Sequence, residues 1–106
     1  MNQDLDVKTQ VKHILKIVQE LAPGRAVELR IPPYAAIQCI EGGNHRRGTP
    51  PNVVEMAPKT LMALSQNPLM WDQLLDEGLI SASGTSADLS ELFIEVSKLV
   101  KVLTED

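Results

Sequence analysis

The apolar residues change their spacing at one point in the chain, and this change limits the possible folds more than any other feature. Within residues 1–22 they recur at helical intervals and so form one apolar stripe. The segment "APGR" at 22–25 then ends the pattern, because proline interrupts a helical hydrogen-bond ladder and glycine accepts the left-handed conformation that often follows. The next segment, "VELRI" at 27–31, alternates apolar and polar residues as a strand does. The sequence therefore predicts a helix that leads into a sheet.

Three later segments also have the composition and alternation of strands. They are "YAAIQCIE" at 34–41, "NVVEMA" at 52–57 and "LISASG" at 79–84. The proline pairs at 32–33 and 50–51 cannot donate to a sheet ladder, so they predict bends between strands.

Helical patterns occupy the remaining regions. Residues 58–77 predict a broken pair of short helices, because "SQNP" interrupts the apolar stripe and Asn67 suits the cap of the second helix. Residues 88–104 predict a long terminal helix with an apolar stripe. Its start is marked by Asp88 and Glu91, whose spacing approaches that of a capping box.

Together these elements predict a single α+β domain in which helices cover a curved antiparallel sheet. Along residues 1–106 the expected order is a helix at 1–22, strands at 27–57, the helix pair at 58–77, a strand at 79–84 and a helix at 88–104.

Charge and cysteine content exclude several classes of function. The formal net charge is -4, which disfavours nucleic acid as a partner because nucleic-acid-binding domains are usually basic. Cys39 is the only cysteine, so neither an internal disulfide nor a zinc site of paired thiolates can form. The first residues lack the pattern of a signal peptide, and no apolar run approaches the ~18 residues of a membrane span. We therefore expect a cytoplasmic protein.

Several strings in a fixed order carry a resemblance to a known family. "VELRIPPYAAIQCIEG", "HRRGTPPNVVE", a tryptophan, "GLISASG" and "ADLSEL" follow one another within residues 27–92. In this order they resemble the short sterol-carrier-like proteins of actinobacteria, which are distant relatives of the sterol carrier proteins. The resemblance implies an antiparallel sheet of about five strands, with helices that enclose an apolar tunnel for acyl chains or sterols. Since the residues themselves predict four strands, we expect a sheet of four to five.

A lipid or another apolar small molecule is therefore the expected ligand, and we expect it between the sheet and the helices. The residues predicted to line this pocket are Ile37, Val54, Met56, Leu61, Leu64, Trp71, Leu92 and Val96. Binding of this kind needs no catalytic residue and no cofactor, so we expect a non-enzymatic protein. The alternative is a protein–protein interaction module or a homodimer with no small ligand, which would explain the long apolar stripe of the terminal helix.

The crowded segment "HRRGTPPNVVE" admits more than one interpretation. His45, Arg46 and Arg47 could contact an anionic head group, or the segment could be a solvated lead into the strand that follows. A metal site would need His13 and a carboxylate besides His45, and a catalytic pair of His45 with Cys39 conflicts with the core spacing of that cysteine. We therefore expect neither a metal nor catalysis here.

Overall fold

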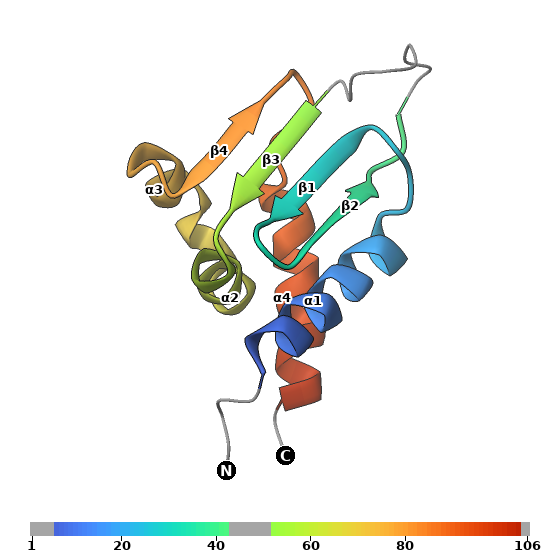
Figure 1. Cartoon of the computed structure of the whole chain (residues 1–106), viewed down its shortest axis with the longest axis vertical. Coiled ribbons are helices and arrows are strands. Elements are labelled where there is room, and N and C mark those ends of the chain that lie inside the picture. The colour runs from blue at the N-terminus through green and yellow to red at the C-terminus, as the bar shows by residue number, and fades with distance from the viewer. Residues whose placement is uncertain (1–5, 43–51, 105–106) are drawn as a thin grey trace.

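The computed structural model describes residues 6–42 and 52–104 (Figure 1). The elements are α1 (Val7–Leu21), β1 (Val27–Ile31), β2 (Ala35–Cys39), β3 (Asn52–Met56), α2 (Pro58–Gln66), the 3-10 turn η1 (Pro68–Met70), α3 (Trp71–Asp76), β4 (Ile80–Ser83) and α4 (Ser90–Thr104). Each predicted strand and helical region therefore contains an element of the expected type.

The four strands form a mixed sheet in the order β2-β1-β3-β4. β1 pairs with β2, and β3 with β4, in antiparallel fashion, but β1 and β3 run parallel, with Val27 opposite Asn52. The prediction of an antiparallel sheet was wrong for this central pair. The physical reason is that β2 folds back along one edge of β1, so β3 can start beside the beginning of β1 and run in the same direction. Alternation in the sequence shows which face of a strand is buried, and does not show which neighbour the strand pairs with.

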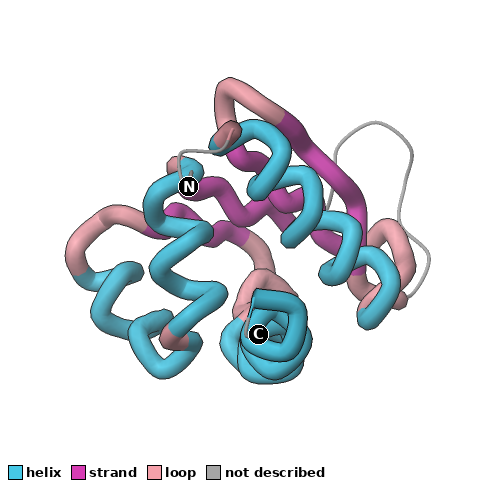
Figure 2. The backbone as a smooth tube through the Cα atoms, turned by 90° about the horizontal axis from the view of Figure 1, so that it is seen from below, coloured by secondary structure: helices cyan, strands magenta, loops and turns pink. Residues whose placement is uncertain are grey.

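One face of the sheet is covered by helices and the other is open (Figures 1 and 2). On the covered face, α4 lies between α1 and α2 and packs against both. The covered face of β1 consists of Val27, Leu29 and Ile31, none of which is exposed. The open face carries Arg30, which lies opposite Glu55. The two side chains form a cross-strand ion pair, with 3.8 Å between Nη1 and Oε1.

The region 58–77 is broken, as predicted, but Asn67 does not cap the second helix. Its side chain makes no capping hydrogen bond, and its backbone N–H instead donates to the carbonyl oxygen of Ala63. The chain then passes through the 3-10 turn before α3 begins at Trp71. The cap was predicted from residue type alone, whereas this connection is stabilised by backbone hydrogen bonds and by packing of η1 on α4.

A proline turn joins β1 to β2 at one end of the sheet. The Pro32–Pro33 peptide is cis, and the backbone N–H of Tyr34 donates to the carbonyl oxygen of Ile31 over 2.9 Å. Neither proline can donate a hydrogen bond to the sheet, so β1 ends before the proline pair and β2 begins after it. The turn leaves the Tyr34 side chain 37% exposed, at the end of the sheet where α1 and α2 begin.

Candidate functional site

The residues predicted to line a pocket between the sheet and the helices all belong to the buried core or pack against it. Val54, Leu61, Leu64 and Val96 are fully buried, and Met56 and Trp71 are each 2% exposed. Ile37 and Leu92 are half-buried and pack against the same cluster. The structure thus brings all eight side chains into one contiguous core, and among them only Trp71 borders a surface pocket described below.

The predicted head-group residues His45, Arg46 and Arg47 lie outside the described residues. The other histidine, His13, is exposed on α1. Cys39 is completely buried, and burial raises the pKa of its thiol to about 11. A neutral, inaccessible thiol is a poor nucleophile. Within residues 6–42 and 52–104, no group of three or more metal-binding side chains could hold a metal ion.

An apolar groove opens where α1, the proline turn and α2 meet. Its larger part has a volume of about 600 Å³. It is lined by Val7 and Gln10 of α1, Pro33 and Tyr34 of the turn, and Ala57, Pro58, Lys59 and Met62 of the α2 region. The segments that meet here are far apart in sequence, and the fold places them together because β1 ends and β2 begins at the level where both helices begin.

A second hollow continues from the first along the cleft between α1 and α2. It measures about 280 Å³ and shares Gln10 and Met62 with the larger part. Ile14 and Val100 add apolar surface, while Thr9, His13, Ser65 and Gln66 add polar groups. We call the two parts together the α1–α2 groove. Because the two parts share these residues, they adjoin each other.

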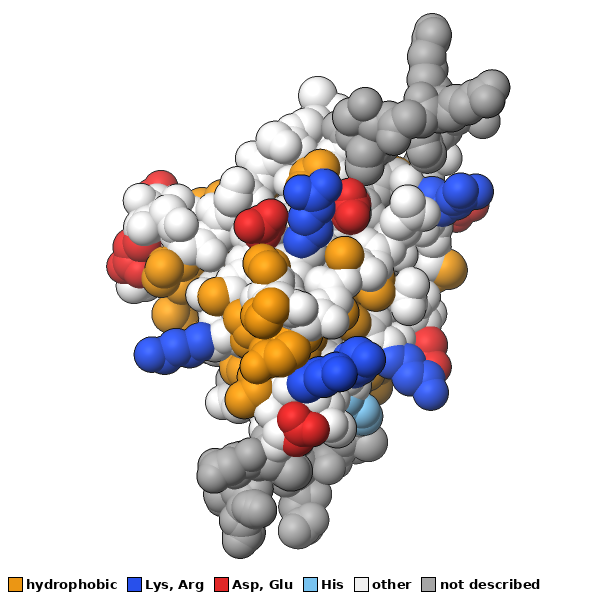
Figure 3. Space-filling view, viewed as in Figure 1, with side chains coloured by type: hydrophobic (Ala, Val, Ile, Leu, Met, Phe, Trp, Pro, Cys, Tyr) orange, Lys and Arg blue, Asp and Glu red, His pale blue; other side chains and the backbone are white. Residues whose placement is uncertain are grey.

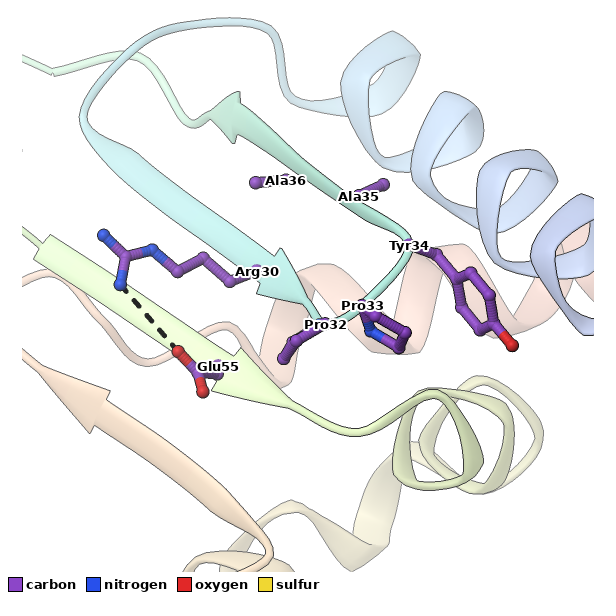
Figure 4. A pocket seen from close by; sticks show the side chains of 7 residues that line it. All are labelled: Arg30, Pro32, Pro33, Tyr34, Ala35, Ala36 and Glu55. Carbon is purple, nitrogen blue, oxygen red and sulfur yellow. Dashed lines mark ion pairs between the residues drawn. The ribbon is translucent and has the colours of Figure 1, made fainter.

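A third hollow, of about 380 Å³, lies on the open face of the sheet (Figure 4). It shares Pro33 and Tyr34 with the groove, but its other wall is formed by the small side chains of Ala35 and Ala36 and by the Arg30–Glu55 pair. The Arg30 guanidinium also lies 3.1 Å from Glu28. Two carboxylates thus compete for one guanidinium, so this hollow is a weaker anion site than its arginine suggests.

Basic side chains lie around the apolar surface (Figure 3). Lys59 lines the larger part of the groove. Lys8 and Lys12 are exposed on α1, close in sequence to the lining residues Val7 and Gln10. Residues 67–100 are acidic as a segment, since they contain Asp72, Asp76, Glu77, Asp88, Glu91 and Glu95 with Lys98 as the only basic side chain. Basic side chains therefore lie beside the groove, although the net charge of the chain is -4.

The sequence contained only a weak signal for these groove residues. Val7 belongs to the helical stripe but is 42% exposed, and Tyr34 follows a double proline. An aromatic side chain held at the tip of a turn is a sign of an exposed apolar surface. Met62 directly follows the buried Leu61 in the chain, yet it is half-buried and lines both parts of the groove.

No curated protein matches the chain. A family model described as bacterial SCP ortholog, where SCP denotes sterol carrier protein, matches residues 4–94. The match includes every strand and the α1 and α2 walls of the groove. Since it spans most of the 106 residues, the chain belongs to this sterol-carrier-protein-like family.

Proposed function

We propose that the protein binds and carries an apolar molecule, such as a fatty acyl chain or a sterol-like lipid, in the α1–α2 groove. Membership of a sterol-carrier-protein-like family indicates lipid carriage at the coarse level. The observation that carries the proposal is the groove itself, whose main part of about 600 Å³ falls within the range of ordinary ligand sites. Its walls are mostly apolar, and Lys59 lies at one side of it.

The energetics favour an apolar ligand over a purely ionic one. Burying a methylene group contributes about 0.8 kcal/mol, so a chain of about sixteen carbons could gain on the order of 10 kcal/mol before the costs of association. A contact between exposed Lys59 and a carboxylate contributes about 1 kcal/mol or less. The apolar walls should therefore determine affinity, and Lys59 should adjust it.

We place the ligand in the groove rather than between the sheet and the helices. Leu61 and Leu64 are fully buried against the core, so an interior ligand would have to separate packed side chains. The groove residues need no such rearrangement, because Val7 and Tyr34 are already exposed to solvent.

Native mass spectrometry of freshly purified protein tests the proposal, because it reports both a retained ligand and the number of subunits. A monomer with added lipid mass supports carriage, and displacement of a fluorescent fatty acid then gives its affinity. A ligand-free dimer that also fails to bind the probe contradicts it. That result would favour the interaction-module alternative, for which Leu69, 82% exposed on η1, would be a candidate contact.

Two matched variants locate the site. Met62→Glu puts a charge into both parts of the groove, and Leu69→Glu puts the same charge on an exposed position outside it. We expect the first variant to lose probe binding and the second to retain it. Equal affinities in two folded variants would exclude the groove as the ligand site.

A further inference from the structure

The two edges of the sheet are protected to different degrees. At the β2 edge, α1 packs against the strand, and Gln19 Nε2 donates a hydrogen bond of 3.5 Å to the carbonyl oxygen of Gln38. Arg25 Nε donates to the side chain of the same glutamine over 3.4 Å. Coverage of this kind is one way in which proteins prevent a sheet edge from pairing with other chains.

At the β4 edge α3 packs against the strand, but the described residues show no side-chain hydrogen bonds like those that cover the β2 edge. Within the described part of the chain, β4 is the last strand of the sheet and pairs only with β3. Its sequence, "ISAS", contains no charged residue and no proline, and Ser81, Ala82 and Ser83 are all exposed. Small, exposed side chains leave room for the backbone of another extended segment to approach.

A small notch lies beside this edge. It has a volume of about 240 Å³ and is bordered by Trp71, Asp72 and Leu75 of α3, Ala82 and Gly84 at β4, and Thr85, Ala87 and Asp88 beyond it. Ala82 belongs to the helix-covered face of the sheet, because its partner on β3 is the buried Val54. A strand added next to β4 would therefore direct every second side chain towards the notch.

The chemistry of the notch suits a cation. Asp72 and Asp88 both border it and are exposed. Hydrogen bonds from the Ser90 side chain and from its backbone N–H, the latter 2.9 Å long to Oδ1, lower the pKa of Asp88 and keep it ionised. Trp71 also borders the notch, but it is only 2% exposed, so the two carboxylates are the groups that a cation would contact.

We propose that the edge of β4 binds an extended basic segment of a partner protein, which joins the sheet as an additional strand. Backbone hydrogen bonds to β4 provide the pairing, and a lysine or arginine side chain enters the notch between Asp72 and Asp88. The acidic surroundings favour such a partner, since Asp76, Glu77 and Glu91 are also exposed in this part of the chain. This site is separate from the α1–α2 groove, and none of the residues lining the notch lines the groove.

The probe is a capped hexapeptide that alternates arginine and threonine, titrated into the full chain. Trp71 is the only tryptophan, so its fluorescence reports directly on the notch. NMR shifts of the Ile80–Ser83 amides report on the strand edge. We expect both signals to change together, and a peptide with glutamate in place of arginine to bind at least tenfold more weakly. Absence of any shift at millimolar peptide would overturn the proposal.

Two backbone-methylated peptides test strand pairing without altering the protein. One carries N-methyl groups on its arginines and the other on its threonines, so each lacks the donors along one of its two edges. Pairing with β4 requires one of them to lose at least tenfold in affinity while the other keeps most of it. If both bind like the parent peptide, attraction by charge alone is responsible and the edge is not a pairing site.

A pair of double variants tests the notch. Asp72→Asn with Asp88→Asn removes two charges but leaves a side-chain acceptor for the Ser90 backbone N–H. Asp76→Asn with Glu77→Gln removes the same charge from residues that do not border the notch. We expect the first pair to weaken the arginine peptide at least tenfold and the second less than threefold. Equal losses would contradict a specific cation site.

Discussion

Asn52 Nδ2 donates a hydrogen bond of 2.9 Å to the carbonyl oxygen of Ala26, across the parallel start of β1 and β3. The Oδ1 atom of the same side chain accepts from the backbone N–H of Ser86, also at 2.9 Å. One amide that is 5% exposed therefore joins the first strand to the segment before α4.

Replacing Asn52 should destabilise the fold strongly. In Asn52→Ala the carbonyl of Ala26 and the N–H of Ser86 both lose their side-chain partner, and each group left unsatisfied costs about 1–3 kcal/mol. We expect the free energy of unfolding to fall by about 2–4 kcal/mol in urea titrations followed by circular dichroism. Ser86→Ala serves as the control, because it keeps the backbone N–H that bonds to Asn52. A loss below about 0.5 kcal/mol for Asn52→Ala would show that the amide link adds little.

Two glycines with positive φ offer a matched comparison of backbone strain and close packing. Gly24 has φ +145° and lies against the backbone of Ile40, where a Cβ atom would collide with the carbonyl group. Gly78 has φ +78°, but a Cβ atom there would have no neighbour within 4 Å. Gly78→Ala should cost about 1 kcal/mol for its conformation alone. Gly24→Ala should cost at least ~2 kcal/mol more, since the steric clash adds to an unfavourable φ. Thermal unfolding of the two variants measures the difference, and equal melting temperatures would contradict it.

The sequence predicted the elements better than their arrangement, and β1 and β3 show why. The alternation in "VELRI" correctly placed Val27, Leu29 and Ile31 on the buried face. Nothing in either strand distinguishes a parallel from an antiparallel neighbour, because burial on one face produces the same alternation in both cases.

The candidate site was harder to predict for a related reason. Apolar periodicity showed that Leu61 and Leu64 face inward, but it could not show whether a cavity remained beside them. Leu61 and Leu64 are fully buried, and a hollow of about 600 Å³ lies where α1, the proline turn and α2 meet. Tyr34 and Met62 meet there only through tertiary structure, since they belong to segments separated by two strands.

Cys39 should make stability depend on alkaline pH. Burial raises the pKa of its thiol from the ordinary value of 9.0 to about 11, so the folded protein keeps the thiol neutral where the unfolded chain ionises it. The contribution to stability is fully present below about pH 9 and is lost as the pH rises to about 11. Within this window we expect a fall of about 1.4 kcal/mol per pH unit from this group. Urea titrations of the parent and of Cys39→Ala isolate the effect, because tyrosine and lysine titrate in both proteins. Parallel curves for the two proteins would contradict it.

The last prediction separates the apolar and ionic contributions to ligand binding in the groove. Lys59 is exposed, so Lys59→Ala should weaken a fluorescent fatty acid by less than about tenfold, as expected for a screened surface contact. Tyr34→Ala removes apolar wall from the larger hollow, and the loss should exceed tenfold, because aromatic side chains contribute large contact areas. Both positions are exposed, so neither change should alter the circular dichroism spectrum. An uncharged ligand, such as the corresponding methyl ester, provides the control, since its affinity should respond to Tyr34→Ala and not to Lys59→Ala. The reverse ranking, with the fatty acid lost in Lys59→Ala and unaffected in Tyr34→Ala, would show that the site recognises the carboxylate rather than the chain.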